Sequence, residues 1–371
     1  MKIVMFGLTI SSSWGNGHAT LLRGLFKALV ARGHRIVFFE RDVPYYEAHR
    51  DMVEFPGVEL HLYDNWSEVR ADAANALRDA DAGIVTSYCP DGIAATELLL
   101  DSQVSLRVLY DLDTPVTLDA WKQGQPLSYI GERGLSDFDL VLSYTGGDAL
   151  IDLQHLLGAQ RVVPLYGSVD PDVHRPVDPP RNLVTDLSYL GTYADDRQSQ
   201  LDSLFIGAAR RLPARRFLIG GSKYPQSFPW LPNIWYIRHV PPANHSDFYC
   251  SSLLTLNVTR ATMARMGYCP SGRLFEAAAC GTAILSDCWD GLTDFFKPGD
   301  EILVVHDVEE TIDAITRPPA ELRRIGAAAR QRVLDQHTAM HRAIEMESIF
   351  EQAFCHAPAQ PAQDSSAVVG G

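Results

Sequence analysis

Two charged side chains, Arg273 and Glu276, interrupt a small and apolar segment in the second half of the chain. The segment reads PSGRLFEAAACG over residues 270–281, and an apolar run follows it. Ser271 is a suitable N-cap and Gly281 a suitable end, so the sequence predicts a short helix and then a buried strand. A helix start attracts phosphate, and a carboxylate accepts from two ribose hydroxyls. The segment therefore predicts a nucleoside-diphosphate site, unless Arg273 and Glu276 merely pair with each other.

Other cations follow predicted strands near this helix. We expect Arg260, Arg265 and Arg273 to gather at one edge of a cleft, where guanidinium groups would stabilise a departing diphosphate. Arg197 and Lys223 come after strands that end in glycine, and both are candidate phosphate ligands. The alternative for each of these two is an exposed cation in water.

A glycine loop, Gly15-Asn16-Gly17, leads into a predicted helix near the start of the chain. Such a loop suits close approach of a ligand or sugar, because glycine leaves the backbone open. His18 stands at the helix start and is a candidate general base, or a group that orients phosphate or acceptor. Its alternative is a histidine that caps its own helix.

Asp111 and Asp113 follow the predicted strand 106–110, at the end where α/β sheets collect ligands. We expect one of these carboxylates to act as a general base or to bind a sugar hydroxyl. The spacing D-x-D also matches a divalent-metal pattern, which is the second interpretation. A third is that the two carboxylates only shape a turn before Thr114 and Pro115.

Short apolar runs alternate with helical segments along the whole chain, which predicts an α/β protein with parallel sheets. In the first half the predicted strands are 2–7, 35–40, 82–88, 106–110, 140–144 and 161–166. In the second half they are 186–191, 217–219, 235–241, 253–258 and 282–286. Prolines over 171–180 mark a linker. We therefore predict domains over 1–168 and 169–335, a last helix over 336–356, and a disordered tail over 357–371.

The composition excludes several classes of function. The 371 residues carry a formal net charge of −14, which argues against nucleic-acid partners and disfavours a membrane partner. The six cysteines have no C-x-x-C or zinc spacing and read as reduced thiols of a cytoplasmic protein. The opening run 2–10 is too short for a signal peptide, and no run reaches transmembrane length.

Five stretches together resemble one branch of the GT-B glycosyltransferases, the CgeB-like or spore-maturation-type family, with a group 1 C-terminal domain. They are SWGNGHAT at 13–20, YDLDTP at 110–115, LYGSVDP at 165–171, LNVTR at 256–260 and the segment 270–287. The resemblance covers roughly positions 1 to 350. It implies two Rossmann-like doubly wound domains facing a central cleft. The acceptor would bind the first domain, the donor would bind the second, and the last helix would cross back onto the first.

The resemblance also places residues around the donor. It implies that the backbone near His239 meets the nucleobase, and that Asp290 and Gly291 lie near the donor sugar. The donor-binding residues expected from all these arguments are Gly191, Tyr193, Arg197, Lys223, His239, Arg260, Ser271, Gly272, Arg273 and Glu276. One position departs from the family: Tyr268 stands where the common retaining pattern has a Glu. The stereochemistry of transfer is therefore left open.

The sequence thus predicts a glycosyltransferase that moves a sugar from a nucleoside-diphosphate sugar to a hydroxyl acceptor. No metal or other cofactor is expected, because arginines and a helix dipole can neutralise the leaving group. One alternative is a sugar-nucleotide epimerase of the same fold. Another is a non-catalytic nucleotide- or carbohydrate-binding protein. A nicotinamide oxidoreductase ranks below both, since neither glycine loop has the dinucleotide spacing.

Overall fold

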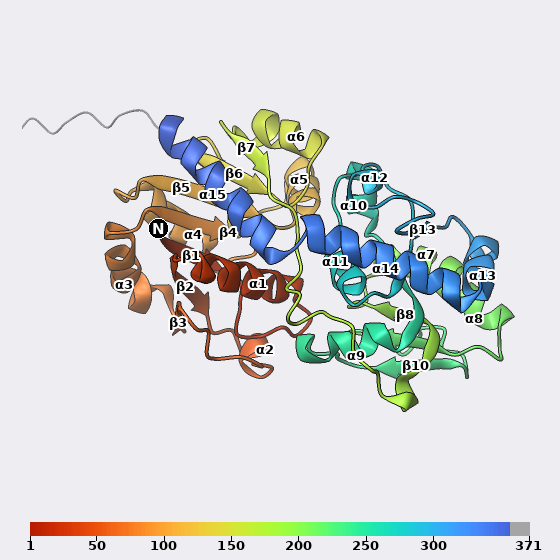
Figure 1. The fold of residues 1–371 in the computed structure, drawn as a ribbon. Helices are drawn as coiled ribbons and strands as arrows, with labels where there is room; N and C mark the ends of the chain where they lie inside the picture. Colours follow the sequence, from red (N-terminus) through yellow and green to blue (C-terminus); the bar gives the residue numbers. More distant parts are fainter. Residues whose placement is uncertain (357–371) are drawn as a thin grey trace, which may run out of the picture.

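The computed structural model describes residues 1–356, which form two parallel sheets flanked by helices (Figure 1). The tail predicted to be disordered, 357–371, lies outside the described residues. Each sheet is doubly wound, so strand order reverses near the middle and ligands gather at the carboxyl ends of the strands. The predicted α/β class with two Rossmann-like halves is confirmed.

The first sheet is parallel throughout. In spatial order its strands are β3 (Val58–Tyr63), β2 (Arg35–Arg41), β1 (Lys2–Gly7), β4 (Ala82–Thr86), β5 (Leu106–Asp111), β6 (Leu140–Ser143) and β7 (Val162–Pro164). One face packs against α1 (Gly17–Ala31) and α15 (Ala339–His356). The other packs against α3 (Trp66–Arg78), α4 (Gly92–Leu100), α5 (Thr114–Lys122) and α6 (Asp148–Leu157). A short helix, α2 (Pro44–Glu47), follows β2.

The second sheet is also parallel. In spatial order its strands are β10 (Ile234–Ile237), β9 (Phe217–Gly220), β8 (Thr185–Leu190), β11 (Ser252–Asn257), β12 (Ala283–Ser286) and β13 (Leu303–Val304). Its α-helices are α7 (Gln198–Leu201), α8 (Gly207–Arg211), α9 (His245–Cys250), α10 (Ala261–Met266), α11 (Gly272–Ala279), α12 (Leu292–Phe295), α13 (Val308–Thr316) and α14 (Pro319–Gln336). A π-helical turn, Asp202–Ile206, joins α7 to α8, and short 3₁₀ turns cover Arg181–Leu183, Asp195–Arg197 and Pro242–Asn244.

The chain crosses between the domains twice, and the two crossings lie side by side. Val169 donates its backbone N–H to His337, and Ala339 donates to Val169. Beyond this point α15 returns to the first domain and lies along α1 (Figure 1). Glu347 on α15 accepts from Arg32 and His34, in each case at 2.6 Å. The C-terminal helix is thereby fixed to the first sheet by both apolar packing and ion pairs.

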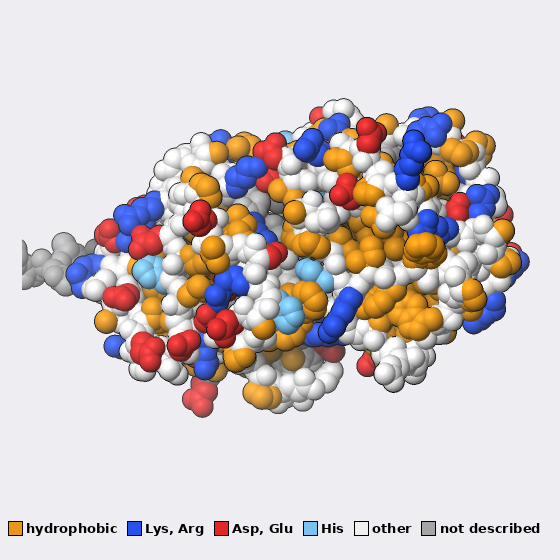
Figure 2. Space-filling model, turned by 90° about the horizontal axis from the view of Figure 1, so that it is seen from below, with side chains coloured by type: hydrophobic (Ala, Val, Ile, Leu, Met, Phe, Trp, Pro, Cys, Tyr) orange, Lys and Arg blue, Asp and Glu red, His pale blue; other side chains and the backbone are white. Residues whose placement is uncertain are grey.

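Surface charge is distributed unevenly over the two domains. On the face shown in Figure 2, acidic side chains are more frequent over the first domain, and apolar side chains gather over the second. No helix within residues 1–356 is long and apolar enough to span a bilayer.

Candidate active site

A cavity of about 620 Å³ lies between the two domains, where the carboxyl ends of both sheets face each other. The first domain contributes the glycine loop, the start of α1 and the loop after β5, including Gly15, Asn16, Gly17, His18 and Asp113. The second domain contributes Gly191, Arg197, Lys223, His239, Arg260, Ser271, Gly272, Arg273 and Glu276. Most of the residues singled out from the sequence therefore converge on one cavity.

The start of α11 presents its free backbone N–H groups to this cavity. Ser271 occupies the N-cap position, but its hydroxyl makes no capping hydrogen bond, which corrects the expected cap. Instead the hydroxyl lies 3.5 Å from Nη1 of Arg273. Arg273 donates to Oδ1 of Asn257 at 2.7 Å and to the carbonyl of Leu190. Its partners are thus groups on β11 and β8 rather than Glu276, so the guanidinium is held at the helix start.

Glu276 lies one turn further along α11, with its carboxylate facing the cavity. Oε2 accepts from the hydroxyl of Tyr249 at 3.0 Å and lies 3.6 Å from Nδ1 of His245. Burial alone would raise the pKa of Glu276, but attraction to His245 and His174 and the Tyr249 hydrogen bond bring it below its ordinary value. Glu276 is therefore an ionised acceptor at neutral pH, which suits a pair of ribose hydroxyls.

Three further cations border the same side of the cavity. Arg260 lies 3.1 Å from Oδ2 of Asp196, and Lys223 is exposed with its ammonium 5.5 Å from the ring centre of Tyr45. Arg197 donates to the carbonyl of Thr192, while its Nε is buried and has no partner among residues 1–356. Arg265 does not join them, because it points away from the cavity and is exposed. The prediction that Arg260, Arg265 and Arg273 gather at the cleft is therefore wrong for Arg265.

His18 and Asp113 form a pair on the opposite side of the cavity. Nε2 of His18 lies 2.6 Å from Oδ2 of Asp113, although the two residues are 95 positions apart in sequence. The cap of α1 comes from Asn16, whose side chain accepts from the backbone N–H of His18. His18 therefore does not cap its own helix, and its imidazole is oriented by a carboxylate instead. Nδ1 of His18 has no partner within the described residues.

Asp111 lies behind this pair rather than in the cavity. Its side chain is fully buried, and Oδ1 accepts from the backbone N–H of Asp113 at 3.1 Å. Oδ2 is buried without a hydrogen-bond partner. Burial raises the pKa of Asp111 to about 6. Of the two aspartates, only Asp113 reaches the cavity lining, so the pair is not arranged as two converging metal ligands.

Three expected residues lie away from the cavity. Tyr193 borders a separate pocket beside Asp202 and Phe228. Tyr268 contacts both residues: its backbone N–H donates to the Asp290 carbonyl at 2.6 Å, and its ring lies against Gly291, while Asp290 itself is exposed. These placements differ from the expected contacts with a donor sugar. They follow from the turn at 267–268, whose residues both have positive φ.

The sequence reasoning missed several residues that build the site. Glu40 is buried and accepts from Thr9 Oγ1 at 2.6 Å and from the backbone N–H groups of Ile10 and Ser11 at 2.7 and 3.0 Å. It therefore holds the chain that enters the glycine loop. Asn257 was quoted only within a motif, yet it holds Arg273. Glu40 could have been singled out from the sequence, because a carboxylate at the end of a predicted buried strand is unusual.

Comparison with known proteins identifies a family and a fold that this chain resembles. A family model described as glycosyl transferase-like matches residues 197–348, which covers most of the second domain and part of α15. No curated protein matches the chain.

Several solved structures share the whole fold. Sucrose-phosphate synthase from Thermosynechococcus elongatus has a TM-score of 0.70 at 15% identity, covering 96% of this chain and 99% of that one. HepE from Anabaena, solved with UDP and glucose, has a TM-score of 0.66 at 10% identity, with coverages of 95% and 100%. An alpha-glucosyltransferase solved with UDP and a 13-mer DNA has a TM-score of 0.68 at 13% identity, with coverages of 95% and 99%. The family match confirms the predicted enzyme class, a glycosyltransferase, and the solved structures confirm the predicted GT-B fold.

Proposed function

We propose that this glycosyltransferase takes its sugar from a UDP-sugar and transfers it to a hydroxyl acceptor without a metal ion. The observation that carries the proposal is the arrangement at α11, where Arg273 and the free N–H groups stand one turn before the ionised Glu276. This spacing matches a diphosphate followed by a ribose. Uridine is favoured as the base because HepE and the alpha-glucosyltransferase, which share the fold, were solved with UDP.

The leaving diphosphate would be neutralised by protein groups alone. Arg273 is fixed by Asn257, and Arg260, Arg197 and Lys223 border the same part of the cavity. Charged hydrogen bonds that converge on one phosphate group are each worth about 1.5–3 kcal/mol, which is enough for arginines and a helix start to replace a metal. The base would lie beside His239, at the loop that follows β10.

His18 would remove the proton from the acceptor hydroxyl. Its imidazole lines the cavity from the first domain, and Asp113 holds Nε2 at 2.6 Å, which leaves Nδ1 to accept a proton. Nδ1 is buried in this structure, so the acceptor hydroxyl must displace the groups that cover it. A carboxylate beside the ring also stabilises the imidazolium that forms during transfer. The acceptor would therefore bind on the side of the first domain, opposite the donor.

Because His18 is the proposed base, we expect transfer with inversion at the anomeric carbon. Retaining members of the resembling family carry a Glu at the position of Tyr268, and Tyr268 is turned onto Gly291 rather than into the cavity. No carboxylate thus stands at that position to assist on the opposite face. We also propose membership of the CgeB-like branch, based on the motifs around Asn16, Asp113 and Asn257, each of which has a structural role in the site.

A nucleotide panel tests the donor assignment. Thermal unfolding of the wild type and of Glu276→Ala would be measured with UDP, GDP, dTDP, CDP and ADP in the presence of EDTA. A ligand at about 100 times its Kd adds roughly 2.7 kcal/mol of stability, so UDP alone should shift the wild type clearly and the variant weakly. A clear shift by a different nucleotide would contradict the uridine assignment, and equal shifts in both proteins would contradict the role of Glu276.

Turnover assays then distinguish a glycosyltransferase from the alternative functions. The UDP-sugar identified by binding would be incubated with and without a panel of hydroxyl acceptors, and products would be followed by mass spectrometry and NMR. Transfer only in the presence of an acceptor, with an inverted anomeric configuration, is expected. Conversion of the sugar nucleotide with no acceptor would indicate an epimerase, and a retained configuration would remove His18 as the base.

A further inference from the structure

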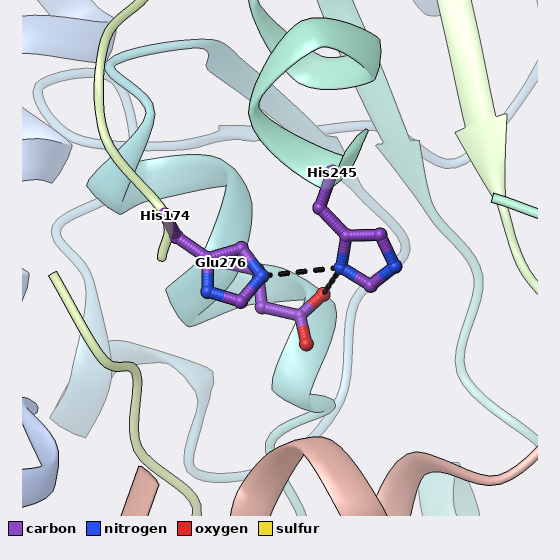
Figure 3. A group of neighbouring side chains, drawn as sticks. All are labelled: His174, His245 and Glu276. Atoms are coloured by element: carbon purple, nitrogen blue, oxygen red, sulfur yellow. Dashed lines mark hydrogen bonds and ion pairs between the residues drawn. The ribbon is translucent and has the colours of Figure 1, made fainter. Parts of the chain in front are cut away.

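Two buried histidines lie beside Glu276, and neither has a role in the transfer proposed above. His174 comes from the linker between β7 and β8, whereas His245 begins α9. Figure 3 shows these two rings and the Glu276 carboxylate converging from three separate segments. His174 is 1% exposed and His245 is 9% exposed, so water does not solvate this group freely.

The donor atoms have the spacing of a metal site. Nε2 of His174 lies 3.1 Å from Nδ1 of His245, and that Nδ1 lies 3.6 Å from Oε2 of Glu276. All three atoms lie within 4.8 Å of one another. A tetrahedral ion with bonds of about 2.0–2.1 Å separates its ligands by roughly 3.3 Å. The two measured separations lie on either side of that value.

The hydrogen bond of His245 to the backbone turns a lone pair of its ring toward Glu276 and His174. Nε2 of His245 lies 3.2 Å from the carbonyl of Val240, so we place its proton there, and Nδ1 then faces Glu276 without one. Nε2 of His174 lies 3.1 Å from the same Nδ1, so a proton on that nitrogen joins the two rings, and a cation bound here would take its place.

We propose that His174, His245 and Glu276 bind a zinc-type divalent cation, and that the bound cation weakens nucleotide binding. Two neutral imidazoles and a carboxylate are a donor set that zinc accepts, with one coordination position left open. The Val240 carbonyl supplies the outer hydrogen bond that fixes the His245 ring. His245 and Glu276 both line the cavity, which gives the cation a route from solvent.

The effect on the nucleotide rests on the proposed role of Glu276. A cation on Oε2 occupies one of the two oxygens that the ribose hydroxyls would use, and it withdraws charge from the other. The two ligands therefore compete, and each lowers the affinity of the other by the same factor. The cation is regulatory in this scheme, and the transfer reaction itself does not require it.

Zinc titration of the EDTA-treated, nucleotide-free protein tests the cation site directly. Calorimetry should give one equivalent of zinc, and cobalt should give the absorption bands of a tetrahedral complex. The affinity should fall roughly 100-fold or more in His174→Gln, which keeps a polar side chain of similar size, and in Glu276→Gln. The matched control is His306→Ala, because His306 is an exposed histidine 3.0 Å from Glu310.

Two results of this titration would overturn the cation site. One is no binding, and the other is equal binding by the wild type and both Gln variants. The exposed thiols Cys288 and Cys355 should be replaced by Ser in every protein compared, since free thiolates also bind zinc. Far-UV circular dichroism of each variant establishes that a loss of zinc binding is not a loss of fold.

A second titration tests the competition. UDP would be titrated into EDTA-treated protein and into protein carrying one equivalent of zinc, and its Kd should rise at least about tenfold with zinc in the wild type. The increase should vanish in His174→Gln, because His174 binds the cation but does not line the cavity. Equal Kd values in the wild type would overturn the competition. Failure of UDP to bind the EDTA-treated wild type would instead contradict the proposed donor, while the zinc titration still decides the cation site.

Discussion

The indole ring of Trp14 packs against the imidazole of His239 across the cleft, with ring centres 4.3 Å apart and ring planes inclined by 39°. Trp14 belongs to the glycine loop of the first domain, and His239 to the loop after β10 of the second. His49 stacks on the same indole, with ring centres 4.1 Å apart. Three packed rings thus join the two domains directly beside the cavity, so the domain arrangement and the shape of the donor site are coupled.

Removing the indole should open the cleft. Aromatic pairs contribute about 0.5–1.5 kcal/mol beyond area burial, and Trp14→Ala removes two such contacts, one of which crosses between domains. We expect a larger radius of gyration by small-angle scattering and a higher KM for the donor. Trp121→Ala is the control, because Trp121 is an exposed residue of α5 with no recorded ring stack. An unchanged scattering profile for Trp14→Ala would contradict this coupling.

The His18–Asp113 pair makes a kinetic prediction. His18→Ala should lower kcat by about 10²–10⁴-fold, since it removes the proposed base, and Asp113→Asn should lower it less. The double variant should be hardly worse than His18→Ala, because the two groups act as one unit. The Kd of UDP should stay close to that of the wild type in all three, and His155→Ala, an exposed histidine on α6, should behave as wild type. Additive losses would show that the two residues act separately.

The fold could be predicted largely from the sequence, because apolar strands and glycine turns alternate in a regular order. The strands and turns that were not predicted are those whose residues show only a weak hydrophobic pattern. Strand β3 lies at the edge of its sheet, and its mixed residues, such as Glu59 and His61, lack the continuous apolar run of the buried central strands. The turn that carries Tyr268 onto Gly291 depends on contacts between distant segments, so no local pattern indicates it.

The site residues that belong to one local motif could be predicted from the sequence. Residues brought together by tertiary contacts were harder to predict. Arg273 and Glu276 were recognisable from one segment, but their separate partners, Asn257 and Tyr249, come from β11 and α9. The histidine pair at 174 and 245 was missed because its members are 71 positions apart and belong to no spacing that sequence reasoning tests. Arg265 was placed wrongly because α10 turns it outward, which depends on the rotation of a six-residue helix.

The buried carboxylate of Asp111 should make stability depend on pH. Its pKa is raised from 3.8 to about 6 in the folded protein, so the folded state binds this proton more tightly than the unfolded state does. The contribution to stability is complete below pH 3.8 and is lost as the pH rises through 6, by about 3 kcal/mol in total. Asp111→Asn removes this ionisation, and we expect its stability relative to the wild type to increase between pH 4.5 and pH 8.

Urea unfolding of the wild type and Asp111→Asn at those two pH values measures the change. Asp72→Asn is the matched control, since Asp72 is an exposed carboxylate in the same domain, and its difference from the wild type should not vary with pH. A constant difference for Asp111→Asn would show that the carboxyl group keeps the same protonation state across this range. Residual activity of the variant would show separately that Asp111 supports the site from behind rather than reacting.

Arg260 and Arg265 offer a matched pair for the diphosphate site. They stand five positions apart at the start and near the end of α10, but only Arg260 lines the cavity. Arg260→Ala removes a charged donor and also leaves Asp196 unpaired beside the phosphate position, so the Kd of UDP should rise by about 10–100-fold. Arg265→Ala removes the same charge from the protein without touching the cavity, and its Kd should not change. Uridine, which lacks phosphate, should bind all three proteins alike. Equal losses of UDP affinity in the two variants would mean that the effect is long-range charge, and that Arg260 makes no specific contact with the diphosphate.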